Sequence, residues 1–314
     1  MQKTALMMVL AFLFAGCAGQ KALRTQLAYG GQAALLLDYQ NNELVIVDMA
    51  AKRARNTIAA PFPLSPGSRI RWSAGNGGVY LLHEARVYEL SIQSGAMREL
   101  YQPRALYDSI CAAGGAIYLE RPAPVPGLGS ELVKYTIDSG EEETFFIDIS
   151  IYNFLADETG NWLLIYGYDA SRSGMFVYNR ETGTCEAVDP EARVTALYSL
   201  YGGIVLYEVY NGIYNRDGAL STIKGTELRV YDWSSGKITT LPHPQDPDAD
   251  DYFLLSEDSF IMTRTHLNTI AQITIAEIFG VKTDFYVANF ADTARVPFYS
   301  TRSKVDLVGV AAGY

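Results

Sequence analysis

Side chains able to act as catalytic bases or to bind a metal are few and far apart in this chain of 314 residues. Its three histidines, His83, His243 and His266, fall in three separate segments. The sequence contains no Gly-x-Ser-x-Gly nucleophile elbow and no HExxH or CxxC spacing, so serine-hydrolase and zinc sites of these kinds are not predicted. We therefore expect no catalytic residue, no metal and no cofactor.

One acidic segment has the alternating carboxylates that recur in calcium-binding loops. Asp246, Asp248 and Asp250 alternate with other residues in segment 246–251, and Ca²⁺ prefers carboxylate oxygens as ligands. The segment lacks the glycine and the distal glutamate of an EF-hand loop. We interpret it as a solvated acidic linker, with calcium binding as the alternative.

A sequence motif typical of a strand, a turn and a second strand recurs along the chain. These strands and turns are the elements that would position the residues of any functional site. The motif reads RVYELSIQSGAMREL at 86–100, LVKYTIDSGEEETFF at 132–146, MFVYNRETGTCEAV at 175–188 and LRVYDWSSGKITTL at 228–241. The turn glycines are Gly95, Gly140, Gly183 and Gly236, at intervals of 45, 43 and 53 residues. Gly-Gly pairs at 30–31, 77–78, 114–115 and 202–203 run in step with them. Two landmarks with a shared period predict a repeat protein.

Each repeat divides into four short runs rich in Tyr, Val, Ile and Leu, which is typical of strands. In the runs before the turns, such as 175–178 and 228–231, apolar residues occupy both alternating positions, so both faces of each sheet should be buried. This pattern predicts an all-β fold, a β-propeller of about six four-stranded antiparallel blades, with seven blades as the alternative. The units cover 25–62, 66–103, 105–147, 149–190, 194–242 and 250–300, and we expect the tail 304–314 to close the ring near the N-terminal blade.

The layout of the repeats resembles the six-bladed TolB-like propellers, a broad bacterial group with many lipoproteins and exported proteins. The resemblance extends over nearly all of the chain after its first residues. The Ser-Pro-Asp-Gly turn usual in that group is replaced here by Ala-Gly-Asn-Gly-Gly at 74–78 and Ala-Ala-Gly-Gly at 112–115.

The N-terminus has the features of an exported lipoprotein. Lys3 precedes the apolar run 4–15, which is shorter than the roughly 20 residues that a membrane span needs. The run reads as a signal peptide, and Phe14-Ala15-Gly16-Cys17 resembles the bacterial lipobox, with an ordinary signal peptide as the alternative. We therefore predict a signal peptide at 1–16, lipid attachment at Cys17 with a short tether over 17–24, and one propeller domain over 25–314. The protein would face the periplasm or lie on the outer membrane in a two-membrane cell, and on the outer face of the plasma membrane otherwise.

The meander of each blade should give the disc two unlike faces. The first–second and third–fourth turns share one face, which we call the plain face, and they are short. The second–third loops and the connections between blades share the opposite face, the loop face, with long segments at 120–131, 208–227 and 265–282. Because loops on a rigid scaffold commonly carry binding residues, we place ligand-binding candidates on the loop face. They are Tyr166, Tyr168, Asp169, Arg172, Tyr210, Asn211, Tyr214 and Arg216. The alternative is that these tyrosines only fill gaps between blades.

A second candidate site is the rim of the central channel, where the first strands begin. Converging polar groups there could hold a small molecule or a peptide end, although a water-filled rim would also be polar. The candidates are Arg69, Arg71, Tyr107, Asp108, Tyr152, Asn153, Tyr198, Asp251 and Tyr252.

The two cysteines that follow Cys17 test the strand assignment. Cys111 should lie on an innermost strand of the third unit and Cys185 on the outermost strand of the fourth. Strand spacings of about 4.8 Å put such positions beyond the Cα separation of about 7 Å that a disulfide tolerates. We predict that both are free, buried thiols.

The formal charge of −10 disfavours nucleic acid as a partner, because no basic stripe is available to neutralise phosphates. It also disfavours docking of the body onto anionic lipid. The main hypothesis is a non-catalytic, membrane-anchored envelope lipoprotein that binds or scaffolds a protein, peptide or glycan through the loop face. The alternatives are an envelope hydrolase or lyase acting on glycans, and, by fold analogy alone, a component of an envelope assembly machine.

Overall fold

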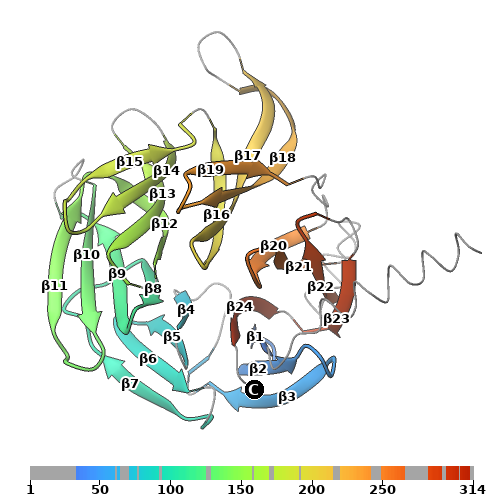
Figure 1. Cartoon of the computed structure of the whole chain (residues 1–314). Helices are drawn as coiled ribbons and strands as arrows, with labels where there is room; N and C mark the ends of the chain where they lie inside the picture. Colours follow the sequence, from blue (N-terminus) through green and yellow to red (C-terminus); the bar gives the residue numbers. More distant parts are fainter. Residues whose placement is uncertain are drawn as a thin grey trace, which may run out of the picture.

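In the residues that it describes, the computed structural model of the chain has 24 strands in six four-stranded antiparallel sheets. Figure 1 shows the sheets arranged as blades around a central axis. The structure describes residues 33–311 except 61, 64–70, 76–77, 92–93, 125–128, 158, 170–172, 191, 215–219, 242–248, 266–281, 292–294 and 304. The predicted all-β propeller of six blades is confirmed.

The blades are numbered in chain order, and their strands are given from the axis outward. Blade 1 contains β24 (Val305–Ala311), β1 (Ala33–Asp38), β2 (Glu43–Asp48) and β3 (Arg53–Ala59); blade 2 contains β4 (Arg71–Gly75), β5 (Gly78–His83), β6 (Arg86–Ser91) and β7 (Met97–Tyr101). Blade 3 contains β8 (Ser109–Ala113), β9 (Ala116–Pro122), β10 (Ser130–Thr136) and β11 (Glu142–Ile147); blade 4 contains β12 (Ser150–Ala156), β13 (Trp162–Tyr168), β14 (Ser173–Asn179) and β15 (Cys185–Val188). Blade 5 contains β16 (Val194–Tyr201), β17 (Ile204–Tyr214), β18 (Leu220–Asp232) and β19 (Lys237–Thr240); blade 6 contains β20 (Ala249–Leu254), β21 (Ser259–Thr265), β22 (Thr283–Asn289) and β23 (Arg295–Thr301).

Both faces of each sheet are buried because each blade lies between two others. All six residues of β1 are buried. Leu35 and its alternate neighbours pack against Val79 and Leu81 of blade 2, whereas Leu36 packs with Phe285 of blade 6. One apolar cluster of this kind lies between each pair of adjacent blades. This arrangement explains why apolar residues occupy both alternating positions of the strands.

The ring closes within blade 1, where the end of the described chain meets its beginning. β24 pairs antiparallel with β1 and supplies the innermost strand of that blade. The innermost strands of all six blades contact one another in sequence around the axis, including β24 with β4 on one side and with β20 on the other. Closure by the C-terminal tail near the N-terminal blade is therefore confirmed.

Hydrogen bonds also join the innermost strands of neighbouring blades. The amide of Ala156 donates to Cys111 Sγ at 3.2 Å between blades 3 and 4. Asn153 Nδ2 donates to the carbonyl of Leu197 at 3.0 Å between blades 4 and 5.

Cys111 is buried on β8, as predicted. Cys185 is exposed on β15, so its predicted burial is wrong; it lies on an outermost strand, which has no further strand of the blade to cover it.

Two segments predicted as loops contain parts of strands. Segment 208–227 is the end of one long β-hairpin, because β17 and β18 pair from Ile204↔Asp232 to Tyr214↔Leu220. β16 pairs with β17 only as far as Val194↔Val209, so the hairpin beyond Val209 forms an arm that leaves the disc (Figure 1). Segment 120–131 similarly contains the end of β9 and the start of β10. Most of the third predicted loop, 265–282, lies outside the described residues.

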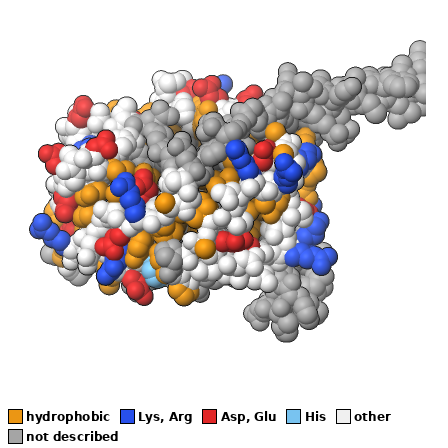
Figure 2. Space-filling model, turned by 90° about the horizontal axis from the view of Figure 1, so that it is seen from below, with side chains coloured by type: hydrophobic (Ala, Val, Ile, Leu, Met, Phe, Trp, Pro, Cys, Tyr) orange, Lys and Arg blue, Asp and Glu red, His pale blue; other side chains and the backbone are white. Residues whose placement is uncertain are grey.

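Within the described part of the chain, no helix has the length and apolar composition needed to cross a bilayer. Figure 2 shows one side of the molecule, on which acidic and basic side chains are interspersed among apolar ones.

Removal of β24 should abolish ring closure. A chain truncated after Lys304 would expose the buried face and edge of β1, so we expect loss of a cooperative thermal transition and aggregation on size-exclusion chromatography. A chain lacking only residues 312–314 is the control and should unfold as the full chain does. A truncated protein that remained monomeric with an unchanged melting temperature would contradict closure by β24.

Candidate functional site

A group of tyrosines lies at the loop-face end of blades 4 and 5. We call Tyr152, Tyr166, Tyr168 and Tyr210 the tyrosine cluster. The rings of Tyr152 and Tyr166 form an edge-to-face pair with centroids 5.3 Å apart and planes at 64°. Tyr168 follows Tyr166 by two residues and so emerges on the same face of β13. Burial raises the pKa of Tyr166, and the nearby Tyr152 and Tyr210 hydroxyls raise it further, against a lowering hydrogen bond with Ser173.

The backbone of blade 4 directs Tyr152 outward through a β-bulge. The pairing of β12 with β13 passes from Ile151↔Gly167 to Asn153↔Tyr166, which leaves Tyr152 as the extra residue. A bulge bends the strand and re-aims the side chain it carries. Tyr152 is 59% exposed.

Gly167, between Tyr166 and Tyr168, lets the connection between blades 3 and 4 pass close to β13. A Cβ atom at this position would lie 2.6 Å from the Ser150 carbonyl oxygen and 2.7 Å from Ile149 Cγ2. Only glycine tolerates this approach. The tyrosine pair is therefore held against a tightly packed backbone.

Tyr210 enters the cluster from blade 5, at the base of the arm. Its amide donates to the carbonyl of Arg193 at 2.9 Å, in the connection between blades 4 and 5. That connection is anchored by Asp189, whose Oδ2 accepts hydrogen bonds from Tyr207 Oη at 2.8 Å and Arg229 Nη1 at 2.7 Å. Tyr210 is 38% exposed, while Tyr207, three residues earlier, is fully buried.

A charged pair continues the loop face over blade 3. Arg121 makes two hydrogen bonds of 3.0 Å to Glu131, through Nε to Oε1 and through Nη2 to Oε2. The guanidinium also lies 5.4 Å from the ring centroid of Tyr107. Burial raises the pKa of Tyr107, and the negative charge of Glu131 raises it further. The carboxylate of Glu131 is thus already neutralised by its arginine.

Glu120, on the opposite face of β9 from Arg121, is buried towards blade 4 and links blade 3 to it. Its carboxyl oxygens accept hydrogen bonds from Ser109 Oγ at 2.8 Å and Ser130 Oγ at 2.7 Å. Ser130 Oγ in turn accepts a hydrogen bond from the amide of Ile151 at 3.0 Å, directly before Tyr152. Burial raises the pKa of Glu120 above its ordinary value, although both serine bonds act in the opposite direction. Because Glu120 is only 2% exposed, it holds strands together rather than facing a ligand.

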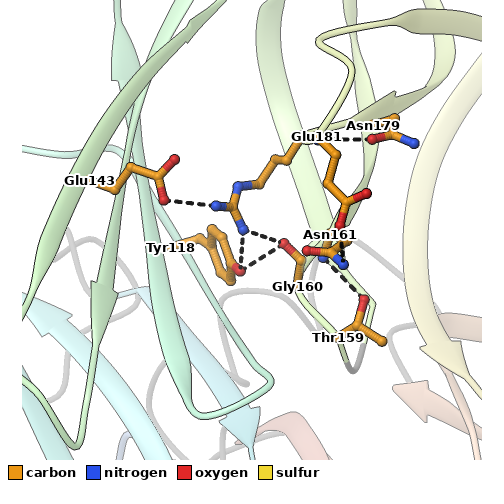
Figure 3. Close-up of polar contacts among 8 residues, drawn as sticks. Tyr118, Glu143, Thr159, Gly160, Asn161, Asn179 and Glu181 are labelled. Atoms are coloured by element: carbon orange, nitrogen blue, oxygen red, sulfur yellow. Dashed lines mark hydrogen bonds and ion pairs between the residues drawn. The ribbon is translucent and has the colours of Figure 1, made fainter.

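A second polar link fixes blades 3 and 4 at the plain face (Figure 3). Arg180 Nη1 donates to the Gly160 carbonyl at 2.6 Å, and Nη2 donates to Glu143 at 2.8 Å. Buried Tyr118 donates to the same carbonyl at 3.0 Å. Gly160 adopts a φ of +69°, and a Cβ there would collide with the Tyr118 hydroxyl. Blade 4 is thereby held to blade 3 at both ends.

The structure separates the candidates predicted from the sequence. Three of the loop-face candidates, Tyr166, Tyr168 and Tyr210, lie together with Tyr152, a candidate for the rim of the central channel. Asp169 directly follows β13 and is half-buried, and Asp108 is exposed, with its amide donating to the Glu120 carbonyl at 2.7 Å. The candidates outside the described residues, or whose side chains are, are Arg69, Arg71, Arg172, Asn211, Tyr214, Arg216 and Asp251.

Three of the rim candidates make contacts within the protein. Tyr252 is buried between blades 5 and 6 and contacts Tyr198 edge-to-face, with centroids 5.2 Å apart. Tyr198 Oη donates to Glu208 at 2.8 Å. The side-chain amide of Asn153 donates a hydrogen bond to the carbonyl of Leu197. These side chains join neighbouring blades.

Among the histidines, only His83 is in the described part of the chain. Its ring stacks on Phe62 with centroids 4.4 Å apart. No group of three or more His, Cys, Asp or Glu side chains among the described residues is placed to hold a metal ion.

Sequence reasoning missed the polar residues of blade 3. Glu120–Arg121 and Ser130–Glu131 are adjacent pairs at the end of β9 and the start of β10, and a hairpin register would have placed Arg121 opposite Glu131.

Sequence reasoning also missed the exposed apolar side chains of Leu106 and Phe146. Within the described residues, the exposed large apolar side chains are Leu106, Phe146, Tyr152, Tyr168, Tyr201, Tyr210 and Ile238. Five of these lie at the loop-face ends of blades 3 to 5 or in the connection entering blade 3; the exceptions are Tyr201 and Ile238.

No protein-family model and no curated protein matches the chain. Among solved structures, TolB from Acinetobacter baumannii is 12% identical with a TM-score of 0.59; the match covers 88% of this chain and 66% of that one, just under two thirds. A chain of a nidogen/laminin complex is 10% identical with a TM-score of 0.56, over 89% and 97% of the two chains. A putative TolB from Agrobacterium tumefaciens is 9% identical with a TM-score of 0.52, over 87% and 90%. At these identities the similarity establishes the propeller fold and no activity.

Glu120 should make stability depend on pH. Its raised pKa means that the folded state binds this proton more tightly than the unfolded chain, so its contribution is complete below the ordinary value of 4.5 and is lost as the pH rises through the folded pKa. The side chain in Glu120→Gln cannot ionise. The melting temperature of the variant minus that of the parent should therefore increase as the pH rises through the folded pKa of Glu120, and this difference should become constant above it.

The control for this titration is Glu186→Gln, which alters an exposed carboxylate on β15. Its melting temperature should follow that of the parent across the same pH series. A constant difference between the Glu120→Gln variant and the parent would contradict the assigned shift.

Proposed function

We propose that this chain is a membrane-anchored lipoprotein of the cell envelope whose propeller binds a protein, peptide or glycan through the loop face, without catalysis. The observation that carries the proposal is the concentration of exposed large apolar side chains at the loop face of blades 3 to 5. Exposed apolar groups of this kind, when gathered in one region, commonly mark interaction sites.

The scaffold supports a binding role because the exposed side chains lie on fixed backbone. Tyr152 and Tyr166 stand on strands that are hydrogen-bonded within blade 4, and blade 4 is tied to blade 3 through Ser130 and Arg180. Little conformational entropy would be lost when such a surface binds its ligand.

Two carboxylates of the same region are engaged in structural contacts. Glu131 is paired with Arg121, and Glu120 is buried beneath the surface. General acid–base catalysis requires a group that can reach the substrate proton. The described part of the site therefore favours binding over hydrolysis.

The membrane anchor is proposed from the lipobox-like sequence before Cys17. A diacylglycerol-modified cysteine would supply two acyl chains, which anchor a protein stably, whereas one chain binds only marginally. The propeller similarity to two TolB structures is compatible with an envelope location and supports it indirectly.

Cys17→Ser should abolish lipid attachment. In cells fed an alkyne-tagged fatty acid, the parent should incorporate the label and sediment with membranes, while the variant should be unlabelled and leave the membrane fraction. Cys185→Ser is the matched control, because it removes an exposed cysteine on β15 and should leave labelling unchanged. Equal labelling of the parent and the Cys17 variant would contradict the anchor.

Binding through the loop face should depend on the tyrosine cluster. The full chain, extracted in detergent, would be used to capture partners from envelope extract, beside the double variant Tyr152→Ala/Tyr210→Ala. We expect capture to fall at least about fivefold in the variant, from the loss of two exposed aromatic contacts. Tyr201→Ala is the control, since Tyr201 is 46% exposed on the plain face. Equal losses in both variants, or loss only in Tyr201→Ala, would contradict the assignment.

A further inference from the structure

We propose that the tyrosine cluster is a carbohydrate-binding site for a neutral oligosaccharide, held mainly by stacking of sugar rings on tyrosine rings. This inference rests on the proposed function and names the ligand class of the same surface.

The cluster offers the type of surface that a sugar ring fits. Tyr152 is 59% exposed, and its neighbour Tyr166 is half-buried and supports it from the side. A tyrosine ring combines a flat apolar face with a hydroxyl at its tip. A pyranose likewise has an apolar C–H face bordered by hydroxyl groups, so stacking and peripheral hydrogen bonds can form together.

The distribution of the rings favours several sugar units over one. The four tyrosines stand on three strands, β12, β13 and β17, which belong to two adjacent blades. Tyr168 is 44% and Tyr210 is 38% exposed. A ligand that contacts all the exposed rings must extend across the interface between blades 4 and 5, as an oligosaccharide can.

Backbone pairing at the cluster disfavours recognition of an extended peptide by strand addition. At Tyr166, β13 is paired with β12 on one side and β14 on the other. At Tyr210, β17 pairs with β18 through Thr226, and the Tyr210 amide is bonded to Arg193. Strand addition needs an open edge of amides and carbonyls. Recognition at Tyr166 and Tyr210 themselves must therefore come from side chains.

Charge favours a neutral ligand. The chain carries a formal charge of −10, and a field of this sign lowers the local concentration of anionic ligands such as sulfated or phosphorylated glycans. Asp169, the residue after Tyr168 in the sequence, adds a further negative charge to blade 4. Stacking on a neutral sugar is also insensitive to salt, which provides a separate test.

The experiment uses the purified full chain in detergent on an array of neutral and anionic oligosaccharides. We expect binding to neutral oligosaccharides, confirmed by calorimetry with the best neutral ligand from the array and unchanged between about 0.05 M and about 0.5 M NaCl. Tyr152→Ala should weaken binding about fivefold or more, and Tyr152→Phe should retain most of it, because the ring face remains. Tyr201→Ala on the plain face should bind as the parent does.

The possible outcomes separate this inference from the proposed function. Binding only to anionic glycans, binding only to a proline-rich control peptide, binding to nothing on the array, or binding unaffected by Tyr152→Ala would each overturn the carbohydrate site. If no neutral glycan binds but capture of an envelope protein still requires Tyr152 and Tyr210, the loop-face function stands without the sugar. Equal melting temperatures of the parent and the variants would show that these losses arise from the site itself.

Discussion

Each sheet of this propeller is apolar on both faces and must therefore pack against a neighbour on each side. No blade is stable alone, because Leu35 and Leu36 of β1 bury their side chains against opposite neighbours, in blades 2 and 6. Six sheets can meet that requirement only as a closed ring, and closure needs a strand from each end of the described chain, β24 and β1. The apolar pattern along the sequence and the shape of the molecule have this single cause.

Closure also determines which residues are free to bind. Since the sheets are packed on both sides, exposed side chains are confined to the two faces and the outer strands. Bulges at the loop-face ends of β12 and β16 break the regular alternation, and on β12 the bulge turns Tyr152 away from the core. Ser130 and Arg180 fix blade 4 at both of its ends, so a ligand would meet a preorganised surface rather than loops that must first become ordered.

Much of this architecture follows from sequence periodicity. The repeat, the burial of both faces and the closing role of the tail were predicted because glycine turns and strand patterns are local signals. Three of the four tyrosines in the cluster were likewise predicted to lie at the loop face, which is where the structure has them. The bulge at Tyr152, the burial of Tyr252 and the length of the β17–β18 hairpin depend on register and on packing between blades, which a single sequence does not display. The Arg121–Glu131 pair was missed for the same reason, since it forms only when β9 and β10 align.

Crosslinking in living cells would show whether ligands meet this propeller at the loop face of blades 4 and 5. A photo-reactive benzoylphenylalanine would be placed at position 210 or at position 201, both of which are exposed tyrosines but on opposite faces. Irradiation should yield a crosslinked product from position 210 and none from position 201. Crosslinking only from position 201, or equally from both positions, would show that ligands do not bind specifically at the loop face.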